Sequence, residues 1–255
     1  MAETPRQTVI CMKWGTLYGP EYVNRLHGMV RRNTARPLRF ICFTDDPNGI
    51  DDAVDARPLP PIALPEHMAQ KPWRKVALWQ SRLGDLDGDV LYLDLDLLVT
   101  GSIDAFFDYK PGASFCVIHN WTTRRKRAPM YKVVGNTSCY RFRVGAHSYL
   151  YDKLQFHPEC FLNKYRNSQT FISNEISEIE YWPDKWCVSF KHSLLPPWPQ
   201  RAFRAATLPE ETKIVAFTGK PDVHDVLTGR WPEPNPAKRI FKTLVPPPWV
   251  AEHWR

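Results

Sequence analysis

Two aspartates interrupt an apolar stretch in the first half of the chain, residues 89–102, which reads DVLYLDLDLLVTGS. Asp94 and Asp96 follow the run VLYL, which is long enough for one buried strand. A buried strand excludes charge unless it is paired or bound to a metal, and residues two apart on an extended chain point to the same face. We therefore expect two hard oxygen ligands side by side, which suits a divalent cation carrying phosphate oxygens. The alternative is that the carboxylates only end the strand and cap a turn before Gly101.

A second candidate site follows the predicted strand 8–12, in the loop KWGTLYGP that spans residues 13–20. This strand-to-helix loop contains two glycines, an aromatic pair and a lysine. Such a composition fits a nucleotide-binding site at the carboxyl end of a strand. The glycines lack the spacing of the dinucleotide fingerprint, so an ordinary turn with core aromatics explains the loop equally well. The predicted strand 38–43 ends in TDDP, where Asp45 either bonds a ribose or base edge or belongs to a plain turn.

Positive charge accompanies the start of a predicted helix at residues 71–79, KPWRKVALW. Its apolar residues Val76 and Trp79 are expected to face the core. Arg74 or Lys75 would then be free to reach a phosphate group. Solvated basic surface is an equally good explanation of both side chains.

Overall charge and composition narrow the class of partner. The chain has 255 residues, 43% of them hydrophobic and 24% charged, which argues for a folded core and against disorder. The formal net charge of +7 favours anionic partners but does not choose among nucleotides, nucleic acid and membrane phosphates. The run RRKR at 124–127 is interpreted as a solvated loop, with acceptor or peripheral membrane contact as the alternative. Nucleic-acid binding would rest on charge alone, because no recognition motif accompanies it.

The six cysteines form no Cys-x-x-Cys pair, and several lie in apolar runs. They are expected to be reduced, buried small hydrophobes, neither zinc ligands nor a disulfide frame. The first residues, MAETPRQ, lack the apolar segment of a signal peptide, and no window approaches the length of a membrane span. The sequence therefore predicts a soluble, cytoplasmic protein.

The order of apolar segments predicts one α/β domain over residues 1–255, without an internal repeat or linker. Further strands are expected at 113–118, 139–142 and 213–217, and helices at 22–32 and 149–163. Residues 167–178 fit a helix or a strand. From Trp231 onward, repeated Pro and Trp predict an extended tail over the domain.

Several motifs occur in an order that resembles the bacterial nucleotide-sugar glycosyltransferases of the GT-A fold, similar to the family-8 glycosyltransferases. The matching segments are KWGTLYGPEYVNRL, FTDD, PWRKVALW, LYLDLDLLVTGS, NTSCYRF, YWPDKWCVSFK and AFTGKP. The resemblance covers about residues 8–225, and the Asp-x-Asp block and PWRK are its most specific parts. It implies a mostly parallel, Rossmann-like sheet flanked by helices.

The resemblance also implies a reaction, in which a sugar moves from a UDP-sugar-like donor to a hydroxyl group of a glycan or other acceptor, with retention of configuration. Asp94 and Asp96 would bind Mn²⁺ or Mg²⁺ at the donor diphosphate, and Gln169 would lie near the sugar. The remaining residues implied to contact the donor are Lys13, Trp14, Gly15, Tyr18, Asp45, Arg74, Lys75, Asn136, Ser138 and Lys220.

The sequence departs from the family pattern at two places. Where relatives show Asp-Gln near the sugar, this chain has Ser168-Gln169. The histidine that supplies a third metal ligand in family-8 enzymes is absent from the matching segment 215–219, VAFTG. His224 lies downstream as a substitute ligand, although a lone histidine is more often a surface or packing residue. These departures motivate an alternative hypothesis, a catalytically degenerate member that binds a nucleotide or glycan or scaffolds glycan biosynthesis.

Overall fold

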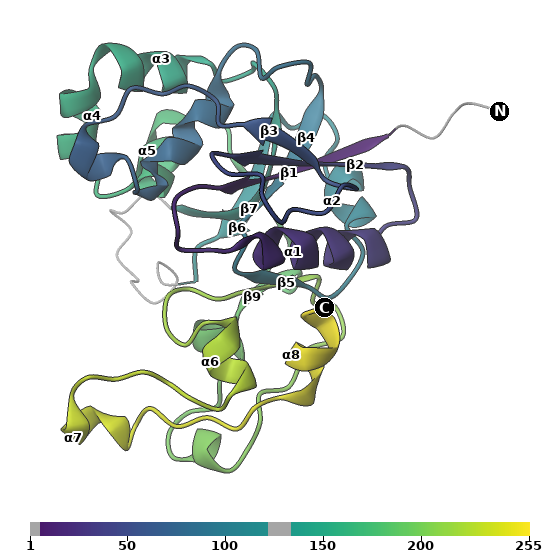
Figure 1. Ribbon diagram of the computed structural model, residues 1–255, viewed down its shortest axis with the longest axis vertical. Coiled ribbons are helices and arrows are strands. Elements are labelled where there is room, and N and C mark those ends of the chain that lie inside the picture. Colours follow the sequence, from purple (N-terminus) through teal and green to yellow (C-terminus); the bar gives the residue numbers. More distant parts are fainter. Residues whose placement is uncertain (1–5, 122–133) are drawn as a thin grey trace.

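The computed structural model describes residues 6–121 and 134–255, and its centre is a seven-stranded sheet flanked by helices (Figure 1). The strands lie in the order β3-β2-β1-β4-β7-β6-β8. Their bounds are β1 Gln7–Lys13, β2 Leu38–Thr44, β3 Asp55–Pro58, β4 Asp89–Leu93, β6 Phe115–His119, β7 Gly135–Arg143 and β8 Glu180–Tyr181. All pairings are parallel except the two that β7 makes with β4 and β6. The predicted α/β fold with a mostly parallel sheet is confirmed.

The sheet is apolar on both faces because alternate residues of a strand point to opposite sides. In β1, Val9 and Cys11 join one apolar cluster, whereas Ile10 and Met12 join the other. All four are essentially inaccessible to solvent. Continuous apolar runs of this kind are typical of strands covered on both faces, which explains why the strands could be predicted from the sequence.

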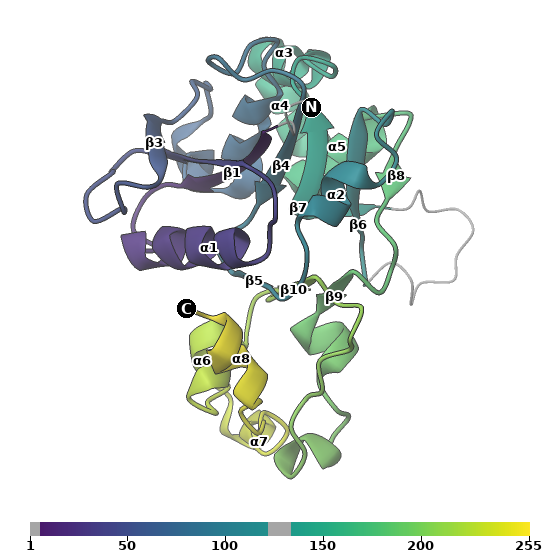
Figure 2. The same cartoon turned by 90° about the vertical axis from the view of Figure 1, so that its right-hand side faces the viewer.

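Helices cover the two faces (Figures 1 and 2). Helix α1 (Pro20–Arg32) packs its buried Val23, Leu26, Met29 and Val30 on one face, which α2 (Asp104–Asp108) shares. The opposite face is covered by the 3₁₀ helix η2 (Pro72–Trp79) and by α3 (Tyr149–Phe156) and α5 (Ser168–Glu175). As predicted, Val76 and Trp79 of η2 are buried. The segment predicted as one helix at 149–163 is instead two, because Pro158 begins α4 (Pro158–Lys164).

A second, three-stranded sheet lies beside the first, in the order β5-β10-β9. It consists of β5 (Leu97–Val99), β9 (Cys187–Ser189) and β10 (Ile214–Ala216). The chain therefore changes sheets between β4 and β5, within the residues Asp94 to Asp96. This change of sheet places the two aspartates in a turn.

The carboxyl-terminal part lies beyond the second sheet (Figures 1 and 2). Its helices are η4 (Phe190–Leu194), η5 (Gln200–Ala202), α6 (Val223–Leu227), α7 (Pro236–Arg239) and α8 (Pro248–His253). The tail from Trp231 is extended except for α7 and α8. Helix α8 packs against α6 and β5, and Trp254 is buried there. Apolar residues of this part belong to the same cluster as the α1 face of the central sheet. The prediction of a single domain over 1–255 stays a prediction.

A buried arginine anchors α2 to the central sheet. Arg141 of β7 is completely inaccessible to solvent. Its guanidinium donates hydrogen bonds to the carbonyl oxygens of Phe106 at 2.7 Å, Tyr109 at 2.8 Å and Lys110 at 2.7 Å. These carbonyls belong to the end of α2 and the turn after it, so the arginine replaces the water that would otherwise satisfy them.

The cysteines are free, as predicted, and all are buried except Cys160, which is exposed. Within residues 6–121 and 134–255, no helix is long and apolar enough to cross a membrane. The basic run 124–127, interpreted above as a solvated loop, lies outside the described residues.

Candidate active site

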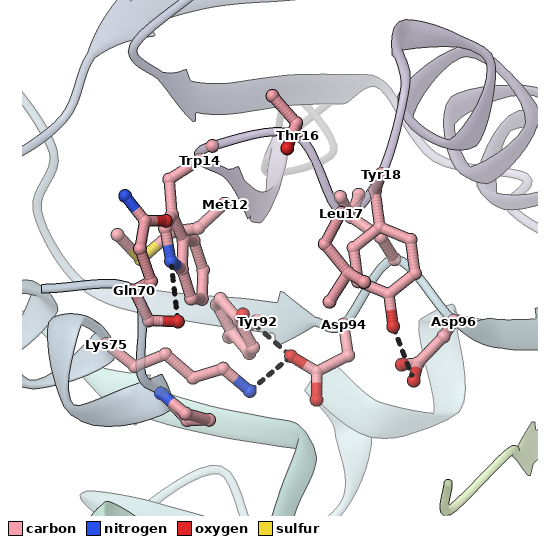
Figure 3. A pocket seen from close by; sticks show the side chains of 13 residues that line it. Met12, Trp14, Thr16, Leu17, Tyr18, Gln70, Lys75, Tyr92, Asp94 and Asp96 are labelled. Carbon is pink, nitrogen blue, oxygen red and sulfur yellow. Dashed lines mark hydrogen bonds and ion pairs between the residues drawn. The ribbon is translucent and has the colours of Figure 1, made fainter. Parts of the chain in front are cut away.

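A pocket of about 860 Å³ opens at the carboxyl ends of β1 and β4 (Figure 3). These strands are parallel neighbours, with Ile10 opposite Tyr92, so the loops that follow them meet at one edge of the sheet. The pocket is lined by Met12, Trp14, Gly15, Thr16, Leu17, Tyr18, Gln70, Pro72, Lys75, Tyr92, Asp94, Leu95 and Asp96. Its size is in the range that holds small-molecule ligands and cofactors.

The two aspartates line this pocket together, but they lie in the turn between β4 and β5 and not on an extended strand. The expectation that they share a strand face is therefore wrong in its backbone geometry. The alternative, that they end the strand, describes the backbone correctly. Both side chains nevertheless face the pocket (Figure 3), because the turn carries the chain from the first sheet to the second.

Asp94 is held by two donors. Lys75 Nζ lies 2.5 Å from Oδ1, and the Tyr92 hydroxyl donates to the same oxygen at 2.8 Å. The Asp94 backbone amide donates to the carbonyl oxygen of Ser138 at 2.8 Å. Lys75 also lies 5.3 Å from the Tyr92 ring centroid. The carboxylate is thus fixed from η2 and β4, the Asp94 backbone is fixed from β7, and the carboxylate charge is compensated by a lysine.

Asp96 lies in a different electrostatic environment. Its Oδ2 accepts a hydrogen bond from the Tyr18 hydroxyl at 3.0 Å. In the described part of the chain no salt bridge reaches this carboxylate. Burial and the neighbouring charge of Asp94 raise the pKa of Asp96 to about 7, and burial with the charge of Asp96 raises the pKa of Tyr18. A buried carboxylate beside another carboxylate favours the arrival of a cation.

The loop after β1 forms the opposite wall of the pocket. Gly15 has φ of 61°, and a Cβ there would lie 2.5 Å from Gln70 Oε1. Its amide donates to Asp45 Oδ2 at 2.9 Å, while Trp14 Nε1 donates to the Gln70 carbonyl at 3.4 Å. Trp14, Gly15 and Tyr18 therefore line the pocket as their predicted roles require. Asp45 is not among the lining residues and holds the loop from β2.

Other predicted contact residues lie around the pocket without lining it. Lys13 is buried and donates to the carbonyl oxygen of Asp46 at 3.2 Å. Arg74 Nε donates to the Ala69 carbonyl at 3.2 Å. Of the pair Arg74 and Lys75, it is Lys75 that reaches the site.

Asn136 and Ser138 lie behind the aspartate turn, on β7. The Asn136 side chain accepts from the Ser138 amide at 3.0 Å, and the Ser138 carbonyl accepts from Asp94. In α5, Gln169 follows Ser168, whose hydroxyl donates to the carbonyl oxygen of the pocket residue Pro72 at 3.1 Å. The start of α5 is thus fixed beside one edge of the pocket.

Lys220 lies just before α6, and His224 lies within it. Lys220 forms ion pairs with Asp222 and, at 2.9 Å, with Asp225. The exposed His224 packs its ring on Tyr22 at 5.5 Å. The described residues contain no group of three or more His, Cys, Asp or Glu side chains that could hold a metal ion. The structure therefore does not gather His224 with the two aspartates, and its predicted ligand role stays a prediction.

Seven residues that line the pocket were not predicted as site residues: Met12, Thr16, Leu17, Gln70, Pro72, Tyr92 and Leu95. Tyr92 carried a usable signal, since it lies two residues before Asp94 and is the polar member of an apolar strand. Gln70 reaches the pocket only because the connector before η2 crosses the loop after β1. Such a crossing of two loops cannot be predicted from a local sequence pattern.

Comparison with known proteins relates this fold to glycosyltransferase structures. No family model matches the chain, and no curated protein matches it. Among solved structures, the galactosyltransferase LgtC in complex with donor and acceptor sugar analogs aligns with a TM-score of 0.60 at 13% identity, over 85% of this chain and 89% of that one. The apo form of the glycosyltransferase GlyE from Streptococcus pneumoniae TIGR4 aligns at 0.56 and 15% identity, over 86% of this chain and 56% of that one. Apo mouse xyloside xylosyltransferase 1 aligns at 0.51 and 12% identity, over 84% and 98%. This chain is similar to these proteins in fold, and the fold is of the GT-A type.

Proposed function

We propose that this protein is a glycosyltransferase that moves a sugar from a nucleotide-diphosphate sugar, with UDP favoured, to a hydroxyl acceptor. The observation that carries the proposal is the position of Asp94 and Asp96, which share one pocket at the switch between the two sheets of a GT-A fold. Ligands of α/β sheets bind at the carboxyl ends of strands where the strand order reverses, and in this sheet that point lies between β1 and β4. Glycosyl transfer in the structural neighbours adds support from fold alone.

The walls of the pocket suit a nucleotide. Trp14 and Tyr18 offer aromatic surface for a base or ribose, and Gly15 allows the loop backbone to approach closely. Lys75 supplies a positive charge for a phosphate group. Arg74, Lys13 and Asp45 do not line the pocket, and they bond backbone groups of the surrounding loops. Direct contact of these three residues with the donor remains part of the proposal.

The residues present also fit a divalent cation such as Mn²⁺ or Mg²⁺. Asp94 and Asp96 are hard oxygen donors, and the raised pKa of Asp96 marks a carboxylate whose charge is poorly compensated. When bound, the cation would act as a Lewis acid that neutralises charge on the leaving diphosphate. Tyr18 would keep Asp96 oriented, and Tyr92 would do the same for Asp94.

Sugar and acceptor contacts form the finer part of the proposal. Gln169 follows Ser168, whose hydroxyl is bonded to Pro72 at the pocket edge. Gln169 would contact the donor sugar together with Asn136 and Ser138. Lys220 would reach the diphosphate after leaving Asp222 and Asp225. Transfer with retention of configuration is our expectation, and a glycan is the expected acceptor.

A thermal-shift screen of UDP-, GDP- and CMP-sugars, each with and without Mn²⁺, tests the proposal. We expect a metal-dependent rise in the melting temperature with one nucleotide, and loss of that rise in Asp96→Asn. Release of the free nucleotide from the stabilising donor would then be measured directly. An unchanged melting temperature with every donor and metal would refute the proposal.

One observation favours a second candidate, a degenerate member that binds a nucleotide or glycan without turnover. Ser168 stands where relatives carry a carboxylate, and its buried hydroxyl is bonded to the Pro72 backbone, a purely structural contact. The same screen distinguishes the active glycosyltransferase from the degenerate binding protein. A donor that stabilises the protein but is never cleaved, with any acceptor supplied, identifies the binding protein.

A further inference from the structure

Two segments in the carboxyl-terminal part of the chain carry exposed large apolar side chains. One of them contains α7, which lies at the end of the molecule opposite α3 and α4 (Figure 1). Phe203 is 86% exposed, Ile240 63%, Trp198 46% and Phe241 44%. We call these four residues the apolar tip. They come from two segments more than thirty residues apart in the chain, WPQRAFR at 198–204 and PAKRIFK at 236–242.

Direct contacts hold the two segments together. Trp198 Nε1 donates to the Ile240 carbonyl at 3.3 Å, and the Trp198 and Phe241 ring centroids lie 5.0 Å apart. The Arg201 guanidinium donates to the Phe241 carbonyl at 2.6 Å. The apolar tip is therefore a built surface, although its side chains remain open to solvent. Large exposed apolar residues that gather in one place mark interaction sites.

Within the two segments that carry the apolar tip, the charges have a single sign. The two segments carry five cations and no aspartate or glutamate. These cations, which we call the cationic rim, are Arg201, Arg204, Lys238, Arg239 and Lys242. No salt bridge reaches any of them within the described residues. A surface of this kind complements a partner that is anionic outside and apolar inside.

One part of the rim is arranged to receive an anion. The Trp231 ring is surrounded by Lys242 Nζ at 4.4 Å, Arg201 at 5.2 Å and Lys191 Nζ at 5.9 Å from its centroid. The Arg201 Nε is buried without a hydrogen-bond partner. Three cations that converge on one ring favour the arrival of a phosphate group.

We propose that the apolar tip and the cationic rim dock this protein on an anionic lipid bilayer. Trp198, Phe203, Ile240 and Phe241 enter the boundary between headgroups and acyl chains, and the rim binds lipid phosphates. Trp and Phe at the boundary combined with nearby Lys and Arg are the pairing that interfacial membrane binding uses. This inference does not depend on the proposed reaction, because binding to lipid is measured without a donor.

Charge and chemistry select the bilayer over other partners. A second copy of the chain would bring five cations against five, and like charges facing each other oppose association. Single-stranded nucleic acid would use aromatic rings for stacking, but the aliphatic Ile240 at 63% exposure offers no stacking surface. A bilayer can bind both surfaces, because its acyl chains accept the apolar tip and its anionic headgroups bind the cationic rim.

Flotation of the full-length protein with vesicles of phosphatidylcholine, with or without phosphatidylglycerol, tests the proposal. We expect binding that requires phosphatidylglycerol and weakens as salt is added. Phe203→Ser combined with Ile240→Ser should lower the partition coefficient about tenfold or more. The matched control is Phe156→Ser, because Phe156 is 76% exposed on α3, at the opposite end of the molecule.

A second pair of variants tests whether lipid binding depends on the residues of the cationic rim or only on the net charge of the protein. Arg204→Glu with Lys238→Glu should abolish the preference for phosphatidylglycerol. Arg82→Glu with Arg166→Glu makes the same change in net charge at exposed positions outside the rim, and should retain most of the binding. Circular dichroism checks that all variants are folded.

Three results would overturn the proposal. The first is failure of the wild type to float with anionic vesicles at low salt. The second is an equal loss of binding in the Phe156→Ser control. The third is tip-dependent binding to an oligonucleotide, or tip-dependent self-association in light scattering, in a protein that ignores vesicles.

Discussion

Lys75 Nζ lies 2.5 Å from Asp94 Oδ1, and the two side chains are only 10% and 17% exposed. One carboxylate of the Asp-x-Asp turn therefore has its counter-charge built into the protein. Asp96, two residues on, has a tyrosine hydroxyl instead. This asymmetry gives the two chemically identical side chains opposite effects on stability.

We predict that Asp96→Asn stabilises the ligand-free protein and Asp94→Asn destabilises it. The raised pKa of Asp96 means that the folded state binds its proton more tightly than the unfolded state between about pH 4 and pH 7. Its contribution to stability therefore falls as the pH rises through this window. The gain from Asp96→Asn should be on the order of 1 kcal/mol at about pH 8 and should vanish near pH 4.

Asp94→Asn should cost about 3 kcal/mol, because it leaves Lys75 buried without its carboxylate. Thermal unfolding of both variants at several pH values measures the two effects. A shift of the same sign in the two variants would contradict the asymmetry. Both variants should lose any stabilisation by Mn²⁺. The two substitutions therefore have the same expected effect on Mn²⁺ binding but opposite expected effects on the stability of the ligand-free protein.

Lys75→Met should strengthen the binding of Mn²⁺ alone while weakening the binding of a nucleotide diphosphate. The lysine neutralises the Asp94 charge that a divalent cation would use, so its removal leaves two adjacent carboxylates for the metal. We expect an affinity for Mn²⁺ about tenfold higher by calorimetry. Lys71→Met is the control, because Lys71 is an exposed lysine four residues earlier. Weaker Mn²⁺ binding in Lys75→Met would show that the ion pair does not compete with the cation.

Much of the fold could be predicted because its signals are local. The buried strands are short apolar runs, and α1 shows a helical period over Val23, Leu26 and Val30. The helices α7 and α8 also carry a local signal, since Pro236 and Pro248 each begin one. The expectation of an extended tail from Trp231 is wrong at these two helices, because proline favours the first helical position.

The site was predicted in part because charge within an apolar run is informative. Asp94 and Asp96 could be found from sequence, but the ion pair with Lys75 depends on how η2 packs against the sheet. Lys220 shows the opposite case. Its partners Asp222 and Asp225 are close in sequence, so the sequence contained a local signal for these ion pairs, which the predicted phosphate contact did not include.

Gly15→Ala should impair the pocket more than it impairs the fold. A Cβ at this position approaches Gln70 Oε1, the end of a flexible side chain that itself lines the pocket. The positive φ costs about 1 kcal/mol. Gly88→Ala is a matched control, because Gly88 has φ of 65° and open space around its Cβ position.

We expect both glycine variants to lose similar stability in urea, and only Gly15→Ala to lose nucleotide affinity. Adding Gln70→Ala to Gly15→Ala removes the steric conflict and should restore part of that affinity. Equal nucleotide binding by Gly15→Ala and Gly88→Ala would show that the space beside Gln70 does not shape the ligand site.

Glu175→Gln should destabilise the protein at neutral pH but not in acid. Burial opposes the charge of Glu175, but hydrogen bonds from Lys153, Tyr165 and Lys164 lower its pKa to about 2. The carboxylate lies at the end of α5, with Lys153 Nζ 2.7 Å from Oε2. Its stabilising effect is fully present above the ordinary glutamate pKa of about 4.5 and is lost as the pH falls toward 2.

The expected loss in Glu175→Gln is about 1–2 kcal/mol at neutral pH, discounted because both lysines are partly exposed. Urea unfolding between about pH 7 and pH 3 should show the difference from wild type shrinking as acid is added. Glu210→Gln removes the same charge from an exposed site and should leave stability nearly unchanged at every pH. A difference that stays constant with pH would mean that the amide disturbs packing at the end of α5, and that the three hydrogen bonds do not depend on the carboxylate charge.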